Sequence, residues 1–178
     1  MAYRSQVDLL EDGAKIVEEL RDETGETVQL SILDDKRMLV LLKEEGVMPL
    51  RIISQIGSRV PVNWAAAGRL LVSDMDDKQL RRFLVQTVRP SATGRANTDI
   101  DSLMGEIRRF RKRGYGTEVN EANAHAGCVA APVVDGRGRC IAAISVAVPE
   151  QRLGKGNRER LIAAVRRAAA NLSKRLGG

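Results

Sequence analysis

The sequence is poor in aromatic residues and cysteine, and it has no long apolar segment. Aromatic residues make up 3% of the 178 residues, so little material exists for the stacking platforms that usually hold single-stranded nucleic acid. Two cysteines do not support a disulfide framework. The longest largely apolar run, IAAISVAV at 141–148, is far shorter than the roughly 20 residues of a membrane helix. These absences favour a cytoplasmic globular protein without a membrane partner.

The common signatures of nucleotide and metal enzymes are also missing. No Walker loop or GxGxxG motif occurs, and the GRG at 136–138 falls in a predicted hairpin turn. His125 is the single histidine; Cys128 follows three residues later, and Glu118 and Glu121 precede it. A closed zinc site normally has paired ligands such as CxxC, and this spacing has none. We therefore predict no metal, no cofactor and no catalytic residue, with His125 as a loop histidine.

The net charge of +6 alone would suggest binding to nucleic acid, but the distribution of the charges argues against it. Residues 1–50 carry six Lys or Arg and twelve Asp or Glu, whereas residues 151–178 carry eight and one. The basic residues of 108–113 and 151–178 are predicted to be solvated helix faces. Predicted helices at 62–73 and 76–87 could mimic a helix-turn-helix, but Asp74, Asp76 and Asp77 would repel phosphates there. We therefore expect no direct DNA binding by this chain.

The first half of the chain predicts a helix, strands and further helices. Residues 5–24 have apolar positions three and four apart, with Gly25 just beyond, which is typical of an amphipathic helix. Alternation over 27–42 around Asp34 and Asp35 predicts a hairpin, and 49–57 predicts a third strand. Helical composition begins near Asn63. Further helices are predicted at 76–87 and from 97–101 to Gly114, with a mobile loop at 89–98.

The second half predicts a hairpin and a closing helix. Two apolar runs, GCVAAPVV and CIAAISVAV, flank the turn DGRG at 135–138, a strong hairpin signal. Leu161, Val165, Ala168, Leu172 and Leu176 form one apolar stripe of a final helix. Strands in two groups around a helical middle favour an α+β fold, with one antiparallel sheet of about six strands and helices on its faces.

Two features could carry chemistry, and each has a structural alternative. Cys128 and Cys140 lie on the two arms of the hairpin, so they could be neighbours, or one could be a nucleophile; free cysteine is also a common small core residue. The small residues at 65–67 would leave backbone N–H groups open at a helix start, where anions bind. If the last two strands lie beside this helix, Cys128 and Ser145 could line a pocket for a small molecule. Close helix-to-sheet packing would explain the small residues equally well.

Several separated blocks resemble one family of proteins. The blocks are ETGETVQLSIL, RIISQIGSRVPVNWAAAGRLL, RRFRKRGYG, GCVAAPVVDGRGRCIAAISVAVP and NLSKRLG. In this order they are similar to the C-terminal effector-binding domain of IclR-type transcription regulators, over residues 5–177. The resemblance implies a GAF-like domain that forms homodimers or homotetramers. It also implies that ligand binding is reported to an N-terminal winged helix-turn-helix, which contacts operator DNA and is absent from this chain.

The resemblance also implies a binding pocket. Its residues correspond here to the backbone N–H groups of Ala66 and Ala67, and to Glu118, Cys128 and Ser145. Family members often have His, Thr, Ser or Gly near the helix start, where Asn63 and alanines stand here. Glu118 replaces a usual Asp, and Ala147 stands where serine can occur, so fewer hydroxyl groups are expected.

The resulting hypothesis is a sensor, not an enzyme. Residues 1–26 would form a linker and first helix that joins the DNA-binding domain, and residues 27–178 would bind a small organic acid. Differential affinity of that acid for two domain arrangements would then change operator binding. Two alternatives remain: a GAF-like reductase using the thiols of Cys128 and Cys140, and an oligomerisation module without a ligand.

Overall fold

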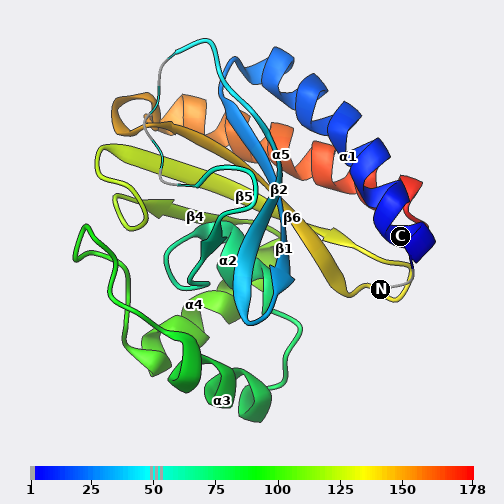
Figure 1. Cartoon of the computed structure of the whole chain (residues 1–178). Helices are drawn as coiled ribbons and strands as arrows, with labels where there is room; N and C mark the ends of the chain where they lie inside the picture. Colours follow the sequence, from blue (N-terminus) through cyan, green and yellow to red (C-terminus); the bar gives the residue numbers. More distant parts are fainter. Residues whose placement is uncertain (1–2, 49, 51, 53) are drawn as a thin grey trace.

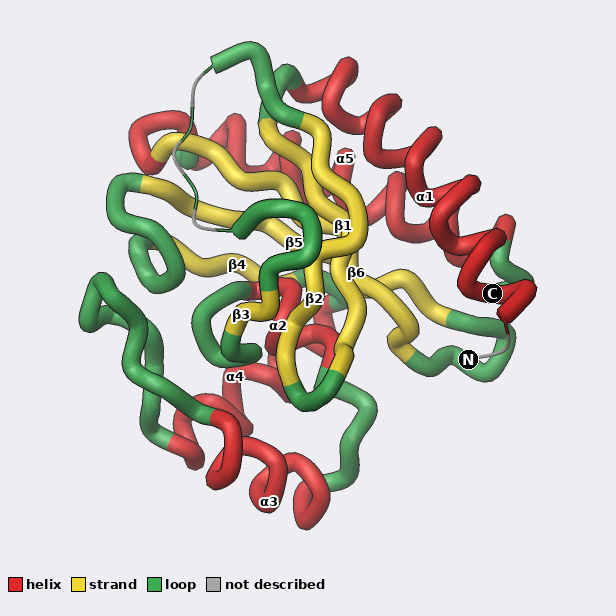
Figure 2. Tube along the Cα trace, viewed as in Figure 1, coloured by secondary structure: helices red, strands yellow, loops and turns green. Residues whose placement is uncertain are grey.

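The computed structural model describes residues 3–48, 50, 52 and 54–178, with side chains from residue 8 onward. Its centre is a six-stranded antiparallel sheet of order β3-β2-β1-β6-β5-β4 (Figures 1 and 2). The strands are β1 Thr27–Asp34, β2 Arg37–Glu44, β3 Arg59–Val60, β4 Gly116–Val119, β5 Ala126–Val134 and β6 Cys140–Pro149. The pairing of β1 with β6 joins the two groups of strands that the helical middle separates in the sequence. The predicted α+β fold is therefore confirmed.

Helices α1 (Tyr3–Thr24) and α5 (Lys155–Arg175) pack together on one face of the sheet (Figure 1). Their apolar stripes form the larger core with the sheet, and the fully buried members include Leu161, Val165 and Leu172. The acidic first helix also meets the basic last helix: Arg175 pairs with Asp12 at 3.2 Å, and Arg167 pairs with Glu23. Exposed pairs contribute about 0–1 kcal/mol each, so apolar burial holds the two helices in place.

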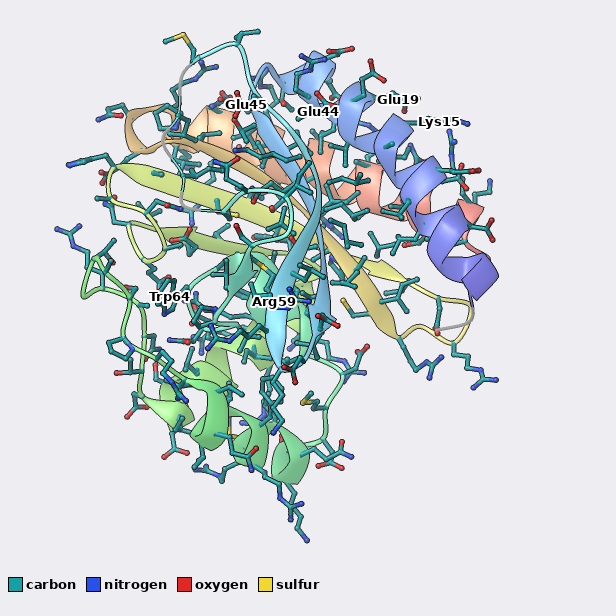
Figure 3. All side chains as sticks on the ribbon, in the orientation of Figure 1. Lys15, Glu19, Glu44, Glu45, Arg59 and Trp64 are labelled. Atoms are coloured by element: carbon teal, nitrogen blue, oxygen red, sulfur yellow. The ribbon has the colours of Figure 1, made fainter. Side chains whose placement is uncertain are left out.

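The exposed surface above α1 is mainly acidic. Figure 3 shows Glu19 extending from α1, with Glu44 at the end of β2 and Glu45 just after it. Lys15 lies on the same helix, and Lys43 pairs with Glu45 at 3.4 Å. The acidic N-terminal part of the sequence thus forms an acidic surface around α1, and part of its charge pairs with basic residues of α5.

The opposite face of the sheet carries α2 (Ala66–Leu71), with α4 (Ile100–Arg113) and α3 (Asp77–Thr87) outside it. All six residues of α2 are buried. Gly68 lets α2 pack closely against the segment that precedes it, because a Cβ atom there would lie 2.5 Å from the Val62 carbonyl oxygen. A small residue thus lets this short buried helix pack between that segment and the sheet.

The predicted helix ends are confirmed at α3 and α4. Asp76 caps α3 by accepting a hydrogen bond from the Gln79 N–H at 2.8 Å, and the Gln79 side chain accepts one from the Asp76 N–H. Gly114 follows α4 with φ of 75°, a left-handed conformation that glycine adopts without strain.

Two expectations need correction. The third strand is Arg59–Val60, not 49–57; positions 49, 51 and 53 of that prediction lie outside the described residues. The helix begins at Ala66 instead of near Asn63, because the Asn63 side chain bonds the carbonyls of Arg89 and Asn97 at 2.9 and 3.0 Å. These bonds also connect Asn63 to the segment 89–98, whose predicted mobility stays a prediction.

Candidate functional site

A small internal cavity lies between α2 and the sheet, with a volume of about 30 Å³. A cavity measured in this way needs about 10–15 Å³ to hold one water molecule, so this space is small but large enough for water. All but two of its lining residues are buried. The polar members are Gln29, Ser54, Glu118, Asn123, Cys128 and Ser145, and the others are Met38, Ile52, Val60, Ala65, Ala67, Ala122, Ala126, Gly127 and Ala147.

A wider groove of about 720 Å³ lies beside α3, between Lys36 and Phe83. None of the residues that line it is buried. A binding site usually combines apolar walls with a few polar groups shielded from water. The internal cavity meets this description and the groove does not, so the smaller space is the better candidate.

The period of two along each strand brings the polar residues of the cavity together. Glu118 on β4 stands opposite Cys128 on β5, which stands opposite Ala147 on β6. Two residues along the sheet, Ser145 on β6 faces Gln29 on β1. Alternate residues of a strand point to opposite faces, so these side chains share the face that α2 covers. Four neighbouring strands thus build the cavity floor.

Gln29 links this floor to the segment before β3. Its side-chain amide nitrogen donates hydrogen bonds to the Ser54 carbonyl oxygen at 3.0 Å and to the Ser54 hydroxyl at 3.1 Å. Both residues are buried. A polar side chain in this position offers hydrogen-bonding atoms to the cavity without a net charge.

Glu118 is the acidic residue of the cavity. Its side chain accepts a hydrogen bond from the Glu121 N–H at 3.0 Å, and the residue is 6% exposed. Burial raises the pKa of Glu118 from 4.5 to about 7, although the bond from Glu121 acts in the opposite direction. Near neutral pH the carboxyl group can therefore both donate and accept hydrogen bonds.

The two cysteines are neither close together nor activated. Cys140 is opposite Val134, six positions along β5 from Cys128, which corresponds to about 20 Å along a strand. Burial, together with the charge of Glu118, raises the pKa of the Cys128 thiol far above its usual value. Burial raises the pKa of Cys140 to about 12. The expectation that the thiols are neighbours is wrong, and both stay protonated at neutral pH, contrary to what a nucleophile needs.

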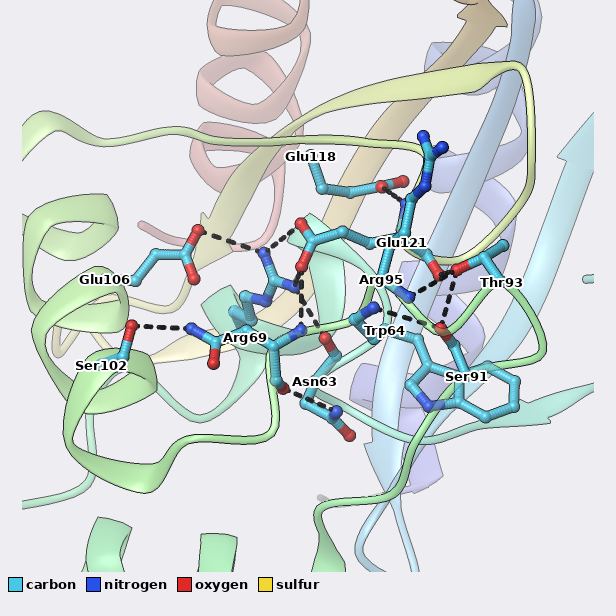
Figure 4. A network of polar contacts seen from close by, with 12 residues as sticks. Asn63, Trp64, Arg69, Ser91, Thr93, Arg95, Ser102, Glu106, Glu118 and Glu121 are labelled. Atoms are coloured by element: carbon cyan, nitrogen blue, oxygen red, sulfur yellow. Dashed lines mark hydrogen bonds and ion pairs between the residues drawn. The ribbon is translucent and has the colours of Figure 1, made fainter.

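A buried arginine lies behind the cavity wall (Figure 4). Arg69 of α2 has no exposed surface. Its guanidinium pairs with Glu121 at 2.6 Å and Glu106 at 3.2 Å, and it donates to the Asn63 carbonyl oxygen at 2.7 Å. Because the Glu121 N–H also binds Glu118, an unbroken chain of contacts runs from the cavity to α4.

Trp64 does not fill the cavity. Its indole N–H donates to the Arg89 carbonyl oxygen at 2.9 Å, and Trp64 lines a separate surface hollow. Figure 4 shows its ring beside Ser91, on the segment anchored by Asn63. The space beneath α2 is therefore left to small side chains.

The structure gathers most of the residues that the sequence suggested. Ala67, Glu118, Cys128 and Ser145 all line the cavity, whereas Ala66 does not; its neighbour Ala65 does. Ala65 precedes α2 in an extended conformation, and no side chain in the described part of the structure caps the helix there. The start of α2 thus borders the cavity through Ala65 and Ala67.

Sequence reasoning missed Gln29, Ser54 and the Arg69 cluster. The position of Gln29 was predictable, because it alternates with Val28 and Leu30, whose side chains are in the core on the other face of the sheet. No local pattern predicts the roles of Ser54 and Arg69, because their partners are far away in the sequence.

The fold and the cavity define an α+β domain with a small, polar-lined space beneath a short helix. The family profile described as "Bacterial transcriptional regulator IclR C-terminal" matches residues 1–174. The chain belongs to this family, whose members are transcription regulators and not enzymes. The reductase alternative is therefore rejected.

Curated relatives agree with this assignment. The chain is 29% identical to the HTH-type transcriptional regulator KdgR of Dickeya chrysanthemi, covering 96% of this chain and 56% of the relative. It is 26% identical to the transcriptional repressor AllR of Escherichia coli K12, covering 99% and 65%. The chain thus spans about half to two-thirds of the length of these regulators.

Solved structures show the same architecture. The C-terminal domain of E. coli KdgR superposes with a TM-score of 0.84 at 26% identity, covering 96% of this chain and 99% of that one. A transcriptional regulator from Rhodococcus sp. RHA1 superposes with a TM-score of 0.89 at 25% identity, covering 98% and 71%.

Two further observations concern the described residues alone. None of their helices is both long and apolar enough to cross a membrane. No three of their His, Cys, Asp or Glu side chains cluster where they could hold a metal ion.

Proposed function

We propose that this chain is the ligand-sensing part of a transcription regulator and that the cavity beneath α2 binds a small organic acid. The observation that carries the proposal is the convergence of Gln29, Ser54, Glu118, Cys128 and Ser145 on one buried space. The relatives are named as HTH-type regulators, and the chain spans only part of their length. A helix-turn-helix segment, joined through residues 1–26, would then contact operator DNA.

The acid would be held by neutral and weakly acidic groups. Its carboxylate would face the start of α2 at Ala65 and Ala67, the residues of this segment that line the cavity, where the helix dipole favours negative charge. Its hydroxyl or keto oxygens would face Ser145, Cys128 and Gln29. Protonated Glu118 would donate a hydrogen bond to the ligand, whereas the ionised form would repel a carboxylate. No bond is made or broken.

The size of the cavity connects binding to a change of shape. A volume of about 30 Å³ is far below the roughly 300–1,000 Å³ of typical ligand pockets, so we expect the walls to separate when an acid binds. A ligand shifts a conformational equilibrium by its difference in affinity for the two states. An acid that binds the expanded cavity would thus favour one arrangement of the whole regulator, which we propose to be a cytoplasmic homodimer or homotetramer.

Thermal unfolding in the presence of organic acids tests this proposal. Two- to six-carbon hydroxy and keto acids are added at about 10 mM to the full chain, each beside its methyl ester. Binding stabilises the folded state, and about 1 kcal/mol raises the Tm by roughly 2–4 °C in a domain of this size. We expect at least one acid to raise the Tm and its ester not to do so.

Two variants locate the effect. Ser145→Ala removes a hydroxyl group from the cavity, and Ala147→Leu fills the space; both should abolish or reduce the shift. Asn171→Ala, on the exposed side of α5, is the matched control. If no acid raises the Tm, or if Ala147→Leu responds as fully as wild type, the cavity is not the binding site and a ligand-free oligomerisation module is the better explanation.

A further inference from the structure

A second group of polar side chains lies on the face of the sheet opposite the cavity. Thr117 precedes Glu118 on β4, so its side chain points toward α5 and not toward α2. Arg113, at the end of α4, and Arg158, near the start of α5, both donate to the Thr117 hydroxyl, at 3.4 and 3.2 Å. Two guanidinium groups from distant parts of the chain therefore meet at one neutral oxygen atom.

In the described part of the structure, neither Arg113 nor Arg158 has an acidic oxygen within 4.0 Å, whereas Arg108 and Arg111 on α4 are paired with aspartates. Arg166, two turns further along α5, approaches Gly114 and adds a third positive charge. The positive charge of Arg113 acts to lower the pKa of Glu106, but the Glu106 carboxylate is already paired with Arg69.

Arg113 is held in place and is not simply solvated. Its guanidinium lies 4.2 Å from the centroid of the Tyr115 ring and 4.8 Å from that of Phe110. Its Nε donates to the Tyr115 carbonyl oxygen at 2.9 Å. Phe110 is itself fixed against Gly116, where a Cβ atom would lie 2.4 Å from the ring. This pre-organisation reduces the entropy that a bound anion would have to offset.

We propose that Arg113, Arg158 and the Thr117 hydroxyl form a binding site for a phosphate group. The two like-charged guanidinium groups that share the Thr117 hydroxyl repel each other. An anion placed between them adds two attractive contacts that offset this repulsion. The planar guanidinium fork matches the oxygen atoms of phosphate, while Thr117 can donate its proton to a third oxygen. Arg166 adds positive charge to the rim. The ligand is inorganic phosphate or the phosphate group of a small ester.

Titration followed by NMR tests this site. The backbone N–H signal of Thr117 is recorded as sodium phosphate or methyl phosphate is added to the full chain, at constant ionic strength balanced with chloride. We expect saturable shifts with both ligands and none with chloride alone. A similar Kd for the two indicates that the phosphate group itself is recognised, and a lower Kd for the ester indicates a phosphorylated metabolite; both support the site.

Substitution of Arg158 gives the decisive comparison, because this exposed side chain can be changed without disturbing the core. Arg158→Gln should raise the Kd at least about tenfold, and Arg158→Lys should recover part of the affinity, because it keeps the charge without the fork. Arg175→Gln, also on α5, is the control and should bind as wild type. Linear, non-saturating shifts, or an unchanged Kd in Arg158→Gln, would overturn the proposal.

This inference is independent of the proposed effector site. The acids in the thermal experiment are tested against the cavity variants Ser145→Ala and Ala147→Leu, whereas phosphate is tested against Arg158→Gln on the other face of the sheet. Failure of one experiment therefore leaves the other interpretable.

Discussion

Gln29 and Ser145 are direct cross-strand partners in the β1–β6 ladder, and both line the cavity beneath α2. This ladder joins the N-terminal hairpin to the C-terminal one. The candidate site therefore spans the junction between the two halves of the sheet. Any change in the pairing of the halves alters the distance between these two side chains.

The bonds between Gln29 and Ser54 should contribute measurably to stability. Gln29→Ala leaves the buried hydroxyl and carbonyl groups of Ser54 without this partner, and an unsatisfied buried polar group costs about 1–3 kcal/mol. We expect the free energy of unfolding, measured by urea denaturation, to decrease by about 1–3 kcal/mol. Gln86→Ala, which removes an exposed bond to Lys36, should change it by less than about 0.5 kcal/mol. Equal effects of the two substitutions would contradict the structure.

Arg69 should be the most sensitive charged residue in the chain. Arg69→Met leaves the carboxylates of Glu106 and Glu121 without their buried partner, and breaking such a pair costs about 3–5 kcal/mol. Adding Glu121→Gln should recover part of this loss, because it removes one unpaired charge. Urea denaturation of the single and double variants measures both effects.

An exposed ion pair provides the comparison for Arg69. Arg108→Met breaks the contact with Asp77, in which both side chains are more than half exposed. Such pairs contribute about 0–1 kcal/mol, so this variant should stay close to wild type. A small loss in Arg69→Met together with a similar loss in Arg108→Met would mean that the cluster around Arg69 does not support the fold.

Local sequence patterns predicted most of the elements but not how they meet. Apolar spacing located α1 and α5, aspartates marked the starts of α3 and α4, and Asp135–Gly138 marked the β5–β6 turn. The pairing of β1 with β6 could not be obtained this way, because it joins residues more than about 100 positions apart. The short α2 was also hard to delimit, since all its residues are buried and no amphipathic period exists.

The candidate site was predictable in part from the residues and in part from a family resemblance. Residue types pointed to the small residues at 65–67, Cys128 and Ser145, and the resemblance added Glu118. The register of the strands explains why these residues converge. Arg69 could not be found, because Glu121 is 52 residues away and an arginine in an apolar helix has no local pattern. The polar composition of the segment 89–98 likewise does not reveal its hydrogen bonds to the distant side chain of Asn63.

Stability should depend on pH through Glu118. Burial raises the pKa of Glu118 from 4.5 to about 7, so the folded state binds more protons than the unfolded state between these values. The contribution of this group to stability is fully present below pH 4.5 and is lost as the pH rises through about 7, by roughly 3 kcal/mol. Glu118→Gln, whose amide oxygen can still accept the Glu121 N–H, should therefore be more stable than wild type at about pH 8.

The difference between wild type and variant isolates this effect. Burial also raises the pKa of Glu26 and of Glu106, so the wild-type pH profile alone combines three groups. Urea denaturation of wild type and Glu118→Gln at pH 5, 6, 7 and 8 should give free energies that diverge as the pH rises. Parallel profiles would show that Glu118 titrates as an ordinary surface carboxylate.

Two glycine-to-alanine substitutions should act in opposite directions. At Gly68 a methyl group would lie 2.5 Å from the Val62 carbonyl oxygen and 2.8 Å from the Val62 Cα atom, so the backbone must shift. Overpacking of this kind costs about 1–3 kcal/mol or more, and Gly68→Ala should lower the Tm by several degrees. At Gly156, in the first turn of α5, a methyl group would meet no atom within 4 Å, and alanine should stabilise the helix by up to about 1 kcal/mol. Thermal unfolding of both variants tests this prediction. A Gly68→Ala protein as stable as Gly156→Ala would mean that α2 does not pack against the 61–65 segment. The cavity wall formed by this segment would then differ from the one described.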